Sequence, residues 1–170
     1  DPNGDFVWVR TWDIPNLTPN TTSFITGIDV DGASNLYLCG FFWQTTDFNN
    51  NPGGSTPMQS NGHKDVFVMK LNSAGYFQWV NTAGGAQSES PADIAVNGQN
   101  EIYVTGWYET GNLLDTRGFV QKFSPNFVST TLNTALLWTK DYQGSGTSAG
   151  YKITVDAQGN TYILGIFKGT

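Results

Sequence analysis

The sequence predicts an all-β fold built from repeated four-stranded antiparallel units. Charged residues make up only 13% of the chain, aromatic residues reach 14%, and 20 glycines interrupt the apolar stretches. This composition is typical of short strands joined by tight turns. An apolar cassette also recurs three times, beginning at Ile28, Ile94 and Ile153. Such repetition indicates a repeat architecture.

Each cassette holds the first two strands of a unit and the turn between them. A tyrosine follows the starting isoleucine by nine residues in all three copies, at Tyr37, Tyr103 and Tyr162. The constant spacing indicates a constant turn length, and turn length sets hairpin register. Asp, Asn and Gly fill the segments between the two strands, as expected for turns.

A third and a fourth strand follow in the first two units. The fourth strands carry Trp79 and Trp138, and Trp8 near the start of the chain matches the same position. From the glycine that ends the second strand to the phenylalanine of the third is 27 residues in the first unit (40 to 67) and 13 in the second (106 to 119). The loop between these strands is therefore 14 residues longer in the first unit.

The second strands are apolar at nearly every position, which suits a sheet covered on both faces. A four-stranded antiparallel unit stacked between copies of itself is a β-propeller blade. The chain is expected to form a single β-propeller portion over 1–170, with two complete blades and parts of two more. The expected parts are the last strand of a preceding or closing blade in 1–20, blades over 24–84 and 91–144, and the first half of a further blade over 150–170.

Because propellers usually have at least four blades, these residues are expected to form an incomplete ring. The remaining blades would come from the same, longer chain or from neighbouring subunits. We favour a longer chain at this stage, and assembly of copies stays open.

The cassette resembles the β-propeller repeats of secreted bacterial proteins called SBBP repeats. The resemblance rests on the Asn-x-Tyr-x-x-Gly pattern, on Thr46-Asp-Phe48, on the run from Asp65 to Gly75, and on Trp79 with Gly84-Gly85. It covers essentially the whole chain. The second unit departs from it, because Gly118 stands where the pattern has an aspartate. The resemblance implies extracellular or cell-surface modules with scaffold or adhesive roles, and it implies no catalytic residue.

The charge and apolar patterns exclude two kinds of partner. The net charge is −6 with eight Lys and Arg residues, so no basic cluster is present for nucleic acid. No apolar run approaches the roughly 20 residues of a membrane span. The single cysteine, Cys39, lies within an apolar strand and is expected to be a buried thiol.

The run from Asp29 to Gly32 invites a calcium-site interpretation, but glycine comes too early for an EF-hand loop. A turn is the favoured interpretation, and we expect no metal and no cofactor; a calcium ion held incidentally by loop carbonyls stays open. His63 is the one histidine and cannot build a two-histidine site. Glu89 and Glu109 are the weak candidates for a glycosidase-like acid pair, and we expect a protein without catalytic activity.

Antiparallel topology brings the longest loops to one end of the fold. The segments 41–64, 81–93 and 139–150 share this end, and variable loops on a rigid scaffold commonly carry binding sites. A protein or glycan partner is therefore expected to bind there. The candidate binding residues are Phe42, Trp43, His63, Trp107 and Tyr108.

The expected function is a non-catalytic scaffold or adhesion module. Two alternatives stay open: a propeller enzyme acting on polysaccharide, as a lyase or hydrolase, and a structural subunit of a larger assembly.

Overall fold

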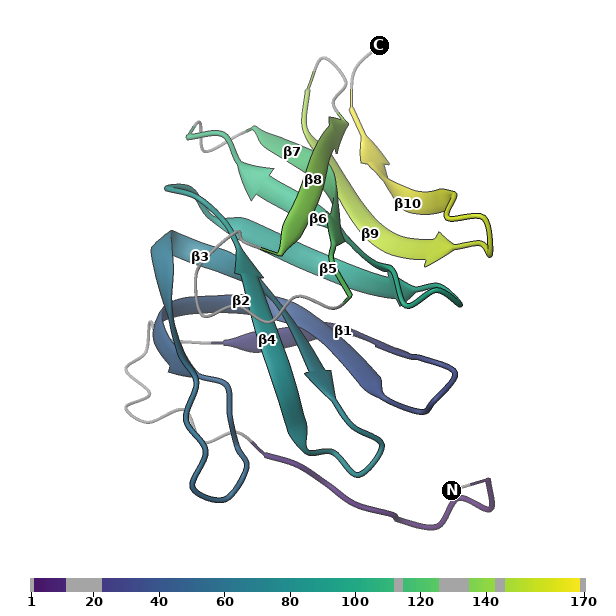
Figure 1. Cartoon of the computed structure of the whole chain (residues 1–170). Helices are drawn as coiled ribbons and strands as arrows, with labels where there is room; N and C mark the ends of the chain where they lie inside the picture. Colours follow the sequence, from purple (N-terminus) through teal and green to yellow (C-terminus); the bar gives the residue numbers. More distant parts are fainter. Residues whose placement is uncertain (1, 12–22, 112–114, 126–134, 143–145, 169–170) are drawn as a thin grey trace.

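The computed structural model describes residues 2–11, 23–111, 115–125, 135–142 and 146–168 (Figure 1). These residues form ten strands and no helix, which confirms the all-β prediction for this part of the chain. Accordingly, the described residues include no helix able to cross a membrane. The strands are β1 (Phe24–Val30), β2 (Leu36–Asp47), β3 (Pro57–Leu71), β4 (Phe77–Ala83), β5 (Glu89–Val96), β6 (Ile102–Glu109), β7 (Thr116–Phe123), β8 (Leu136–Tyr142), β9 (Ser148–Val155) and β10 (Thr161–Phe167).

The strands form three antiparallel sheets in chain order. Unit 1 is β1–β2–β3–β4, unit 2 is β5–β6–β7–β8, and unit 3 is the pair β9–β10. The prediction of four-stranded antiparallel sheets is thus confirmed. All sheet connections are between neighbouring strands, so the ends that join β1 to β2, β3 to β4, β5 to β6, β7 to β8 and β9 to β10 lie at one end, the turn end. The ends that join β2 to β3, β4 to β5, β6 to β7 and β8 to β9 lie at the opposite end, the loop end.

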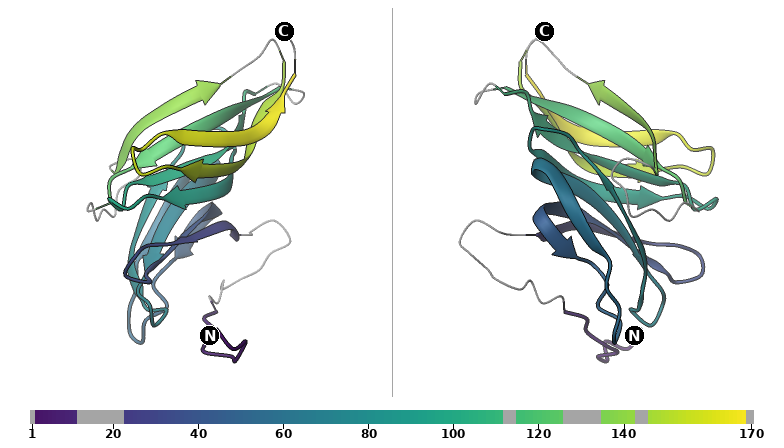
Figure 2. Two further views of the ribbon diagram at one scale, coloured as in Figure 1. Left: turned by 90° about the vertical axis from the view of Figure 1, so that its right-hand side faces the viewer. Right: turned by 60° about the vertical axis from the view of Figure 1, so that its left-hand side comes forward.

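The three units stack face to face (Figure 2). The first strand of each unit packs across the preceding sheet: β5 contacts β1, β2 and β3, and β9 contacts β5, β6 and β7. Between units 1 and 2 the buried cluster includes Tyr37, Cys39, Ile94 and Val104. The Cys39 thiol is fully buried, as expected, and burial raises its pKa to about 12.

The turn between the first two strands has the same conformation in all three units. In unit 1 the Ser34 N–H donates to the Asp31 carbonyl, and Ser34 itself has a φ of 63°. Asn100 and Gly159 occupy the same position, with φ values of 61° and 85°. This is a type I turn followed by one left-handed residue, a common three-residue hairpin connection. The repeated spacing from isoleucine to tyrosine follows from this shared turn.

The glycine at the fifth position of each second strand, which the sequence predicts to end that strand, lies within it and allows the first strand to approach closely. A Cβ at Gly40, Gly106 or Gly165 would overlap a backbone carbonyl oxygen of the adjoining first strand, at Phe24, Ser90 and Ala149 respectively. A larger residue would therefore displace that strand.

The long connection of unit 1 is largely strand, whereas the sequence predicts a loop over 41–64. Thr45 pairs with Gln59 and Asp47 with Pro57, beyond a bulge after Trp43. Phe48 and Met58 from this extension pack with Phe42 and Phe67 on the sheet. The two apolar side chains give the extension a core of its own, which explains why it forms strands.

Residues 5–11 form no strand, although a strand is expected in 1–20. They lie beside the β3–β4 turn, where the Trp8 ring contacts the Gly75 position. The Arg10 guanidinium donates to the Ala74 carbonyl (3.1 Å) and stacks over the Tyr76 ring at 4.3 Å. Residues 12–20 of the expected segment lie outside the described residues.

Candidate functional site

The loop end of unit 1 carries an aromatic patch on β1, β2 and β3. The rings of Trp43 and His63 lie 5.7 Å apart, and the Lys64 ammonium lies 4.7 Å from the centre of the Phe41 ring. Phe41 in turn contacts Phe24 at 5.4 Å. His63 is exposed and Trp43 is half-buried. We call these five residues the Trp43 patch; the cation beside its rings gives it both stacking and polar capacity.

A second aromatic patch lies at the loop end of unit 2 and reaches unit 3. Trp107 packs edge-on against Tyr151 at 5.8 Å. The Tyr108 hydroxyl donates to the Asp141 carboxylate at 3.0 Å, and burial, with Asp141 next, raises the pKa of Tyr108. We call Trp107 and Tyr151 the Trp107 patch; Tyr108 and Asp141 lie on the opposite face of the unit 2 sheet, where Tyr108 packs against the cluster between units 1 and 2. Trp107 and Tyr108 are half-buried, so part of each ring faces solvent.

Phe42 is the candidate binding residue that the structure places in the core. Its side chain is fully buried and contacts Phe48 edge-on at 5.4 Å. Strand alternation is the cause, because adjacent residues of β2 point to opposite faces. Phe42 therefore packs beneath the hairpin extension while its neighbours Phe41 and Trp43 belong to the surface patch.

The acid pair at the loop end differs from the one that the sequence indicates. Glu89 contacts Asp65 of β3, while Glu109 lies exposed at the end of β6. Asp65 is fully buried, and no N–H or hydroxyl of the described residues donates to its Oδ1 or to Glu89 Oε2. The two carboxyl groups share a hydrogen bond, in which a protonated Glu89 donates to the Asp65 carboxylate.

Burial and mutual repulsion explain the protonation of this pair. Burial, and next the charge of Asp65, raise the pKa of Glu89 to about 8, and burial also raises the pKa of Asp65. The Asn61 N–H donates to Asp65 Oδ2 at 2.6 Å and favours the charge on that residue. Glu89 is therefore the member of the pair that carries the proton near neutral pH.

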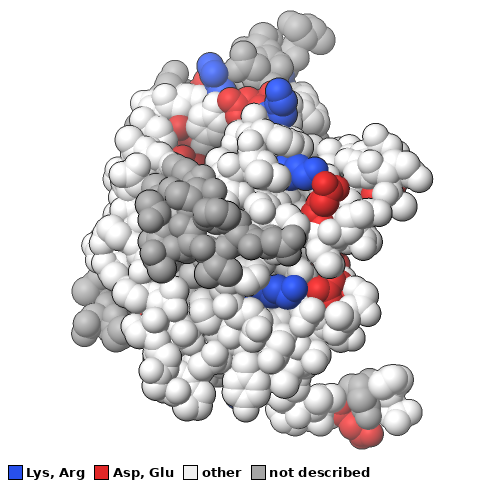
Figure 3. Space-filling view, in the orientation of Figure 1, with Lys and Arg blue, Asp and Glu red and all other residues white. Residues whose placement is uncertain are grey.

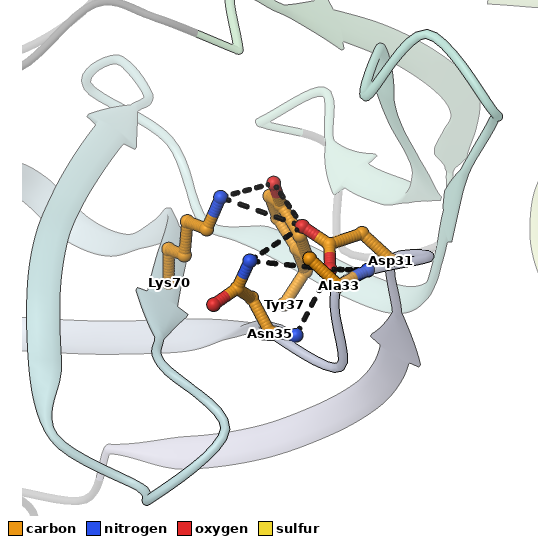
Figure 4. Close-up of polar contacts among 5 residues, drawn as sticks. All are labelled: Asp31, Ala33, Asn35, Tyr37 and Lys70. Atoms are coloured by element: carbon orange, nitrogen blue, oxygen red, sulfur yellow. Dashed lines mark hydrogen bonds and ion pairs between the residues drawn. The ribbon is translucent and has the colours of Figure 1, made fainter.

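The carboxylate that prompted the calcium interpretation organises the turn end instead (Figure 4). Asp31 Oδ1 accepts from the N–H groups of Ala33 and Asn35, both at 2.9 Å. The Tyr37 hydroxyl reaches Asp31 Oδ2 at 3.3 Å, and the Lys70 ammonium lies 3.5 Å from it. The turn interpretation of Asp31 is confirmed.

The electrostatics of Asp31 follow from these contacts. Burial on its own would raise the pKa of Asp31, but the hydrogen bonds from Asn35 and Ala33, with the Lys70 charge, outweigh burial and lower it to about 2. The carboxylate is thus ionised and fully engaged by protein donors at neutral pH.

The same arrangement recurs in unit 2 with acid and amide exchanged. Asn97 stands at the Asp31 position and Glu101 at the Asn35 position. The Glu101 carboxylate accepts from the Tyr103 hydroxyl (3.0 Å) and the Lys122 ammonium (2.6 Å). The recurring tyrosine and lysine therefore bind the carboxylate of the turn and stabilise the turn in both units. Within the described part of the chain, no three His, Cys, Asp or Glu side chains gather in a group suited to a metal ion.

Charged side chains are sparse on the surface, and some of them form ion pairs. Figure 3 shows a face with few charges, whose Lys and Arg side chains lie near Asp or Glu side chains. Lys70, Lys122 and Lys152 each form an ion pair with a carboxylate.

Several residues near the loop end escape sequence reasoning. Asp141 comes from β8 of the same sheet as Tyr108, so their contact depends on strand register within unit 2. Tyr151 comes from β9, and its contact with Trp107 depends on the stacking of unit 3 on unit 2. The Asp65–Glu89 contact depends likewise on the packing of β5 against unit 1. Position was the available signal for Glu89 and Asp141, which lie at strand ends on the loop end, but not for Asp65 and Tyr151, which lie within β3 and β9.

No family model matches the chain. A viral protein, an uncharacterized WD repeat-containing protein of Acanthamoeba polyphaga mimivirus, is 27% identical to it over 122 residues. The match covers 66% of this chain and 8% of that protein. The chain therefore spans a small fraction of the length of the curated relative it matches.

Proposed function

We propose that the chain is a portion of a β-propeller of the SBBP type. Three observations support the proposal: the antiparallel four-stranded sheets, their face-to-face stacking through the first strand of each unit, and the similarity to a protein with WD repeats. WD repeats build β-propellers, in which four-stranded sheets surround a central axis. On this proposal units 1 and 2 are complete blades and unit 3 is half of one.

The proposed role is a non-catalytic scaffold or adhesion module of a secreted or surface-attached bacterial protein. The loop end would bind a protein or glycan partner through the Trp43 and Trp107 patches. The observation that carries this role is the pair of half-buried tryptophans on rigid strands, because such rings stack on sugars and on apolar side chains without losing much conformational freedom. The resemblance to extracellular repeats supports the location.

A glycan array probed with the whole chain tests the proposal. We expect binding to at least one oligosaccharide, with affinity lowered about tenfold or more by Trp43→Ala or Trp107→Ala, as measured by calorimetry on the best ligand. Tyr76→Ala is the matched control, because Tyr76 is an exposed aromatic residue at the turn end. Equal effects of all three substitutions would contradict the proposed surface. Absence of glycan binding would leave a protein partner, tested with the same variants.

An enzyme acting on polysaccharide is the second candidate function, and the Asp65–Glu89 pair is the observation that favours it. Glycoside cleavage uses a protonated carboxyl and a carboxylate, held roughly 5–9.5 Å apart around the scissile bond, and the direct contact of Glu89 with Asp65 leaves no such gap. The burial of Asp65 argues against access to a sugar ring. Release of reducing ends from the bound oligosaccharide, abolished in Glu89→Gln, would establish this alternative, whereas binding without turnover supports the module.

A further inference from the structure

The two ends of the stack expose opposite halves of the same interface. Each unit has a leading face, which receives the first strand of the following unit, and a trailing face, which packs on the preceding unit. Ile94 of β5 and Ile153 of β9 belong to trailing faces, and both are buried, at 3% and 7% exposure. Ile28 of β1 stands at the same repeat position but is 59% exposed.

On the leading face of unit 3, side chains are exposed at the positions that are buried on the leading faces of units 1 and 2. Tyr37 and Tyr103, at the leading faces of units 1 and 2, are 0% and 2% exposed. Tyr162 stands at the same position on β10 and is 57% exposed, and Leu164 beside it is 69% exposed. The difference arises because units 1 and 2 are each followed by another sheet along the described chain, while unit 3 is the last one described.

The two formed junctions show what each side of a junction supplies. At the first, the Asp29 carboxylate of unit 1 accepts from the Val96 N–H of β5 at 2.7 Å. At the second, the Asp93 carboxylate of unit 2 accepts from the Ile153 N–H of β9 at 3.1 Å. Each junction thus combines an apolar isoleucine contact with a hydrogen bond from the backbone of the arriving first strand to a carboxylate of the receiving unit. Unit 3 has Thr154 at the Asp29 position and Lys152 at the Asp93 position, so a junction on unit 3 rests on the apolar contact.

The leading face of unit 3 has room for such a contact. A recess of about 310 Å³ is lined by residues from both of its strands and from β5, among them Lys152, Tyr162 and Leu164. Val30 of β1 is exposed beside Ile28 and offers a second apolar side chain to this surface. Strand β1 therefore presents the side-chain types that β5 and β9 bury at the formed junctions.

We propose that the trailing face of β1 in a second copy of this chain packs on the leading face of β9–β10, so that copies associate head to tail. The new junction continues the series of two junctions within the chain. The contact is heterologous, because it joins two different surfaces, and such contacts generate rings where the rotation closes and open stacks where it does not. It lies apart from the two aromatic patches and does not rest on the proposed binding function.

Complementation between two blocked variants tests the proposal on the whole chain. Leu164→Asp places a charge on the leading face of unit 3, and Ile28→Asp places one on the trailing face of unit 1. For the unsubstituted 18.6-kDa chain, sedimentation velocity over a concentration series is expected to show species that grow with concentration. Each variant alone is expected to stay monomeric, and an equimolar mixture is expected to form a two-chain species and nothing larger.

The mixture also establishes that the variants fold, because each still carries one intact half of the junction. Leu137→Asp is the matched control, since Leu137 is 57% exposed on β8, away from both faces; it is expected to assemble like the unsubstituted chain. A chain that stays monomeric at every concentration would overturn the proposal. So would variants that fail to complement, or a control that blocks assembly equally.

Discussion

The carboxylates at the turn end make similar contacts in units 1 and 3 but differ in burial. Asp31 is buried and bound by amides, a hydroxyl and an ammonium, whereas Asp156 has the equivalent contacts to Asn160 and Tyr162 but is only half-buried. A hydrogen bond to a charged group contributes more when water is excluded from it. The two positions therefore form a natural pair for mutation.

We predict that Asp31→Ala lowers the free energy of unfolding by about 1–3 kcal/mol, because it leaves buried donors without an acceptor. Asp156→Ala, the control, should have a much smaller effect. Urea denaturation at pH 7 measures both. The folded-state pKa of Asp31 is about 2, below its usual value of 3.8. The contribution of its charge is therefore complete above pH 4 and is lost as the pH falls towards 2. A gap between the two variants that stays constant from pH 7 to pH 2 would contradict this account.

Ser34 occupies a backbone conformation that its side chain disfavours. Its φ of 63° lies in the left-handed region, where a residue with a Cβ loses about 1 kcal/mol relative to glycine. Unit 3 has Gly159 at this position. We predict that Ser34→Gly raises the free energy of unfolding by about 0.5–1 kcal/mol, measured by urea denaturation. Destabilisation by this substitution would mean that the entropy lost by glycine on folding outweighs the relief of strain.

The β2–β3 extension is the element in which prediction from sequence was least accurate. Repetition identified the strands of units 1 and 2, because turn chemistry and apolar spacing are local properties of the chain. The extension has no counterpart in unit 2, so its strands were predicted as loop. Its structure depends on Phe48 and Met58 meeting the sheet, a contact between distant parts of the chain. The same limit applies to Phe42, whose direction depends on strand register, and to the partner of Glu89.

We predict that Phe48→Ala destabilises the protein by about 3–5 kcal/mol, the range for loss of a buried phenylalanine. The Phe48 ring contacts Phe42 and also Phe67, at 4.9 Å from the latter. His63→Ala, an exposed substitution on the same hairpin, is the control and should change stability little. Thermal unfolding followed by near-UV circular dichroism measures both. Similar melting temperatures for the two variants would show that the extension does not pack on the sheet.

The contact between β3 and β5 has a pH dependence of its own. Glu89 ionises near 4.5 in an unfolded chain but near 8 in the fold. Raising the pH from 4.5 to 8 therefore releases the proton from the unfolded state first and lowers stability through this window; the loss is complete above pH 8. We predict that Glu89→Gln removes this decline, as measured by urea denaturation at pH 4.5, 6.5 and 8.5. Glu109→Gln is the exposed control, and an equal change in both variants would contradict the assignment.

The molecule as a whole is a stack in which each unit contacts only its neighbours. In such an arrangement stability is close to a sum of unit terms and junction terms. Unit 2 has a junction on each face, whereas units 1 and 3 have one each within the described chain. Unit 3 also has only two strands, and its β10 exposes Tyr162 and Leu164. Opening of unit 3 therefore breaks one junction and one strand pair, but opening of unit 2 breaks two junctions and three pairs.

We predict that amide hydrogen exchange in dilute solution is slowest in β6 and β7 and fastest, among the strands, in β10. Local opening free energies follow the contacts that opening removes, and mass spectrometry of peptic fragments resolves these strands. Head-to-tail association would add a junction to unit 3, so exchange in β9 and β10 should slow as the concentration rises. In Leu164→Asp this concentration dependence should vanish while β6 and β7 stay protected. Equal protection of all three units at every concentration would contradict this account. It would mean that the units unfold together, because the junctions are as stable as the sheets they join.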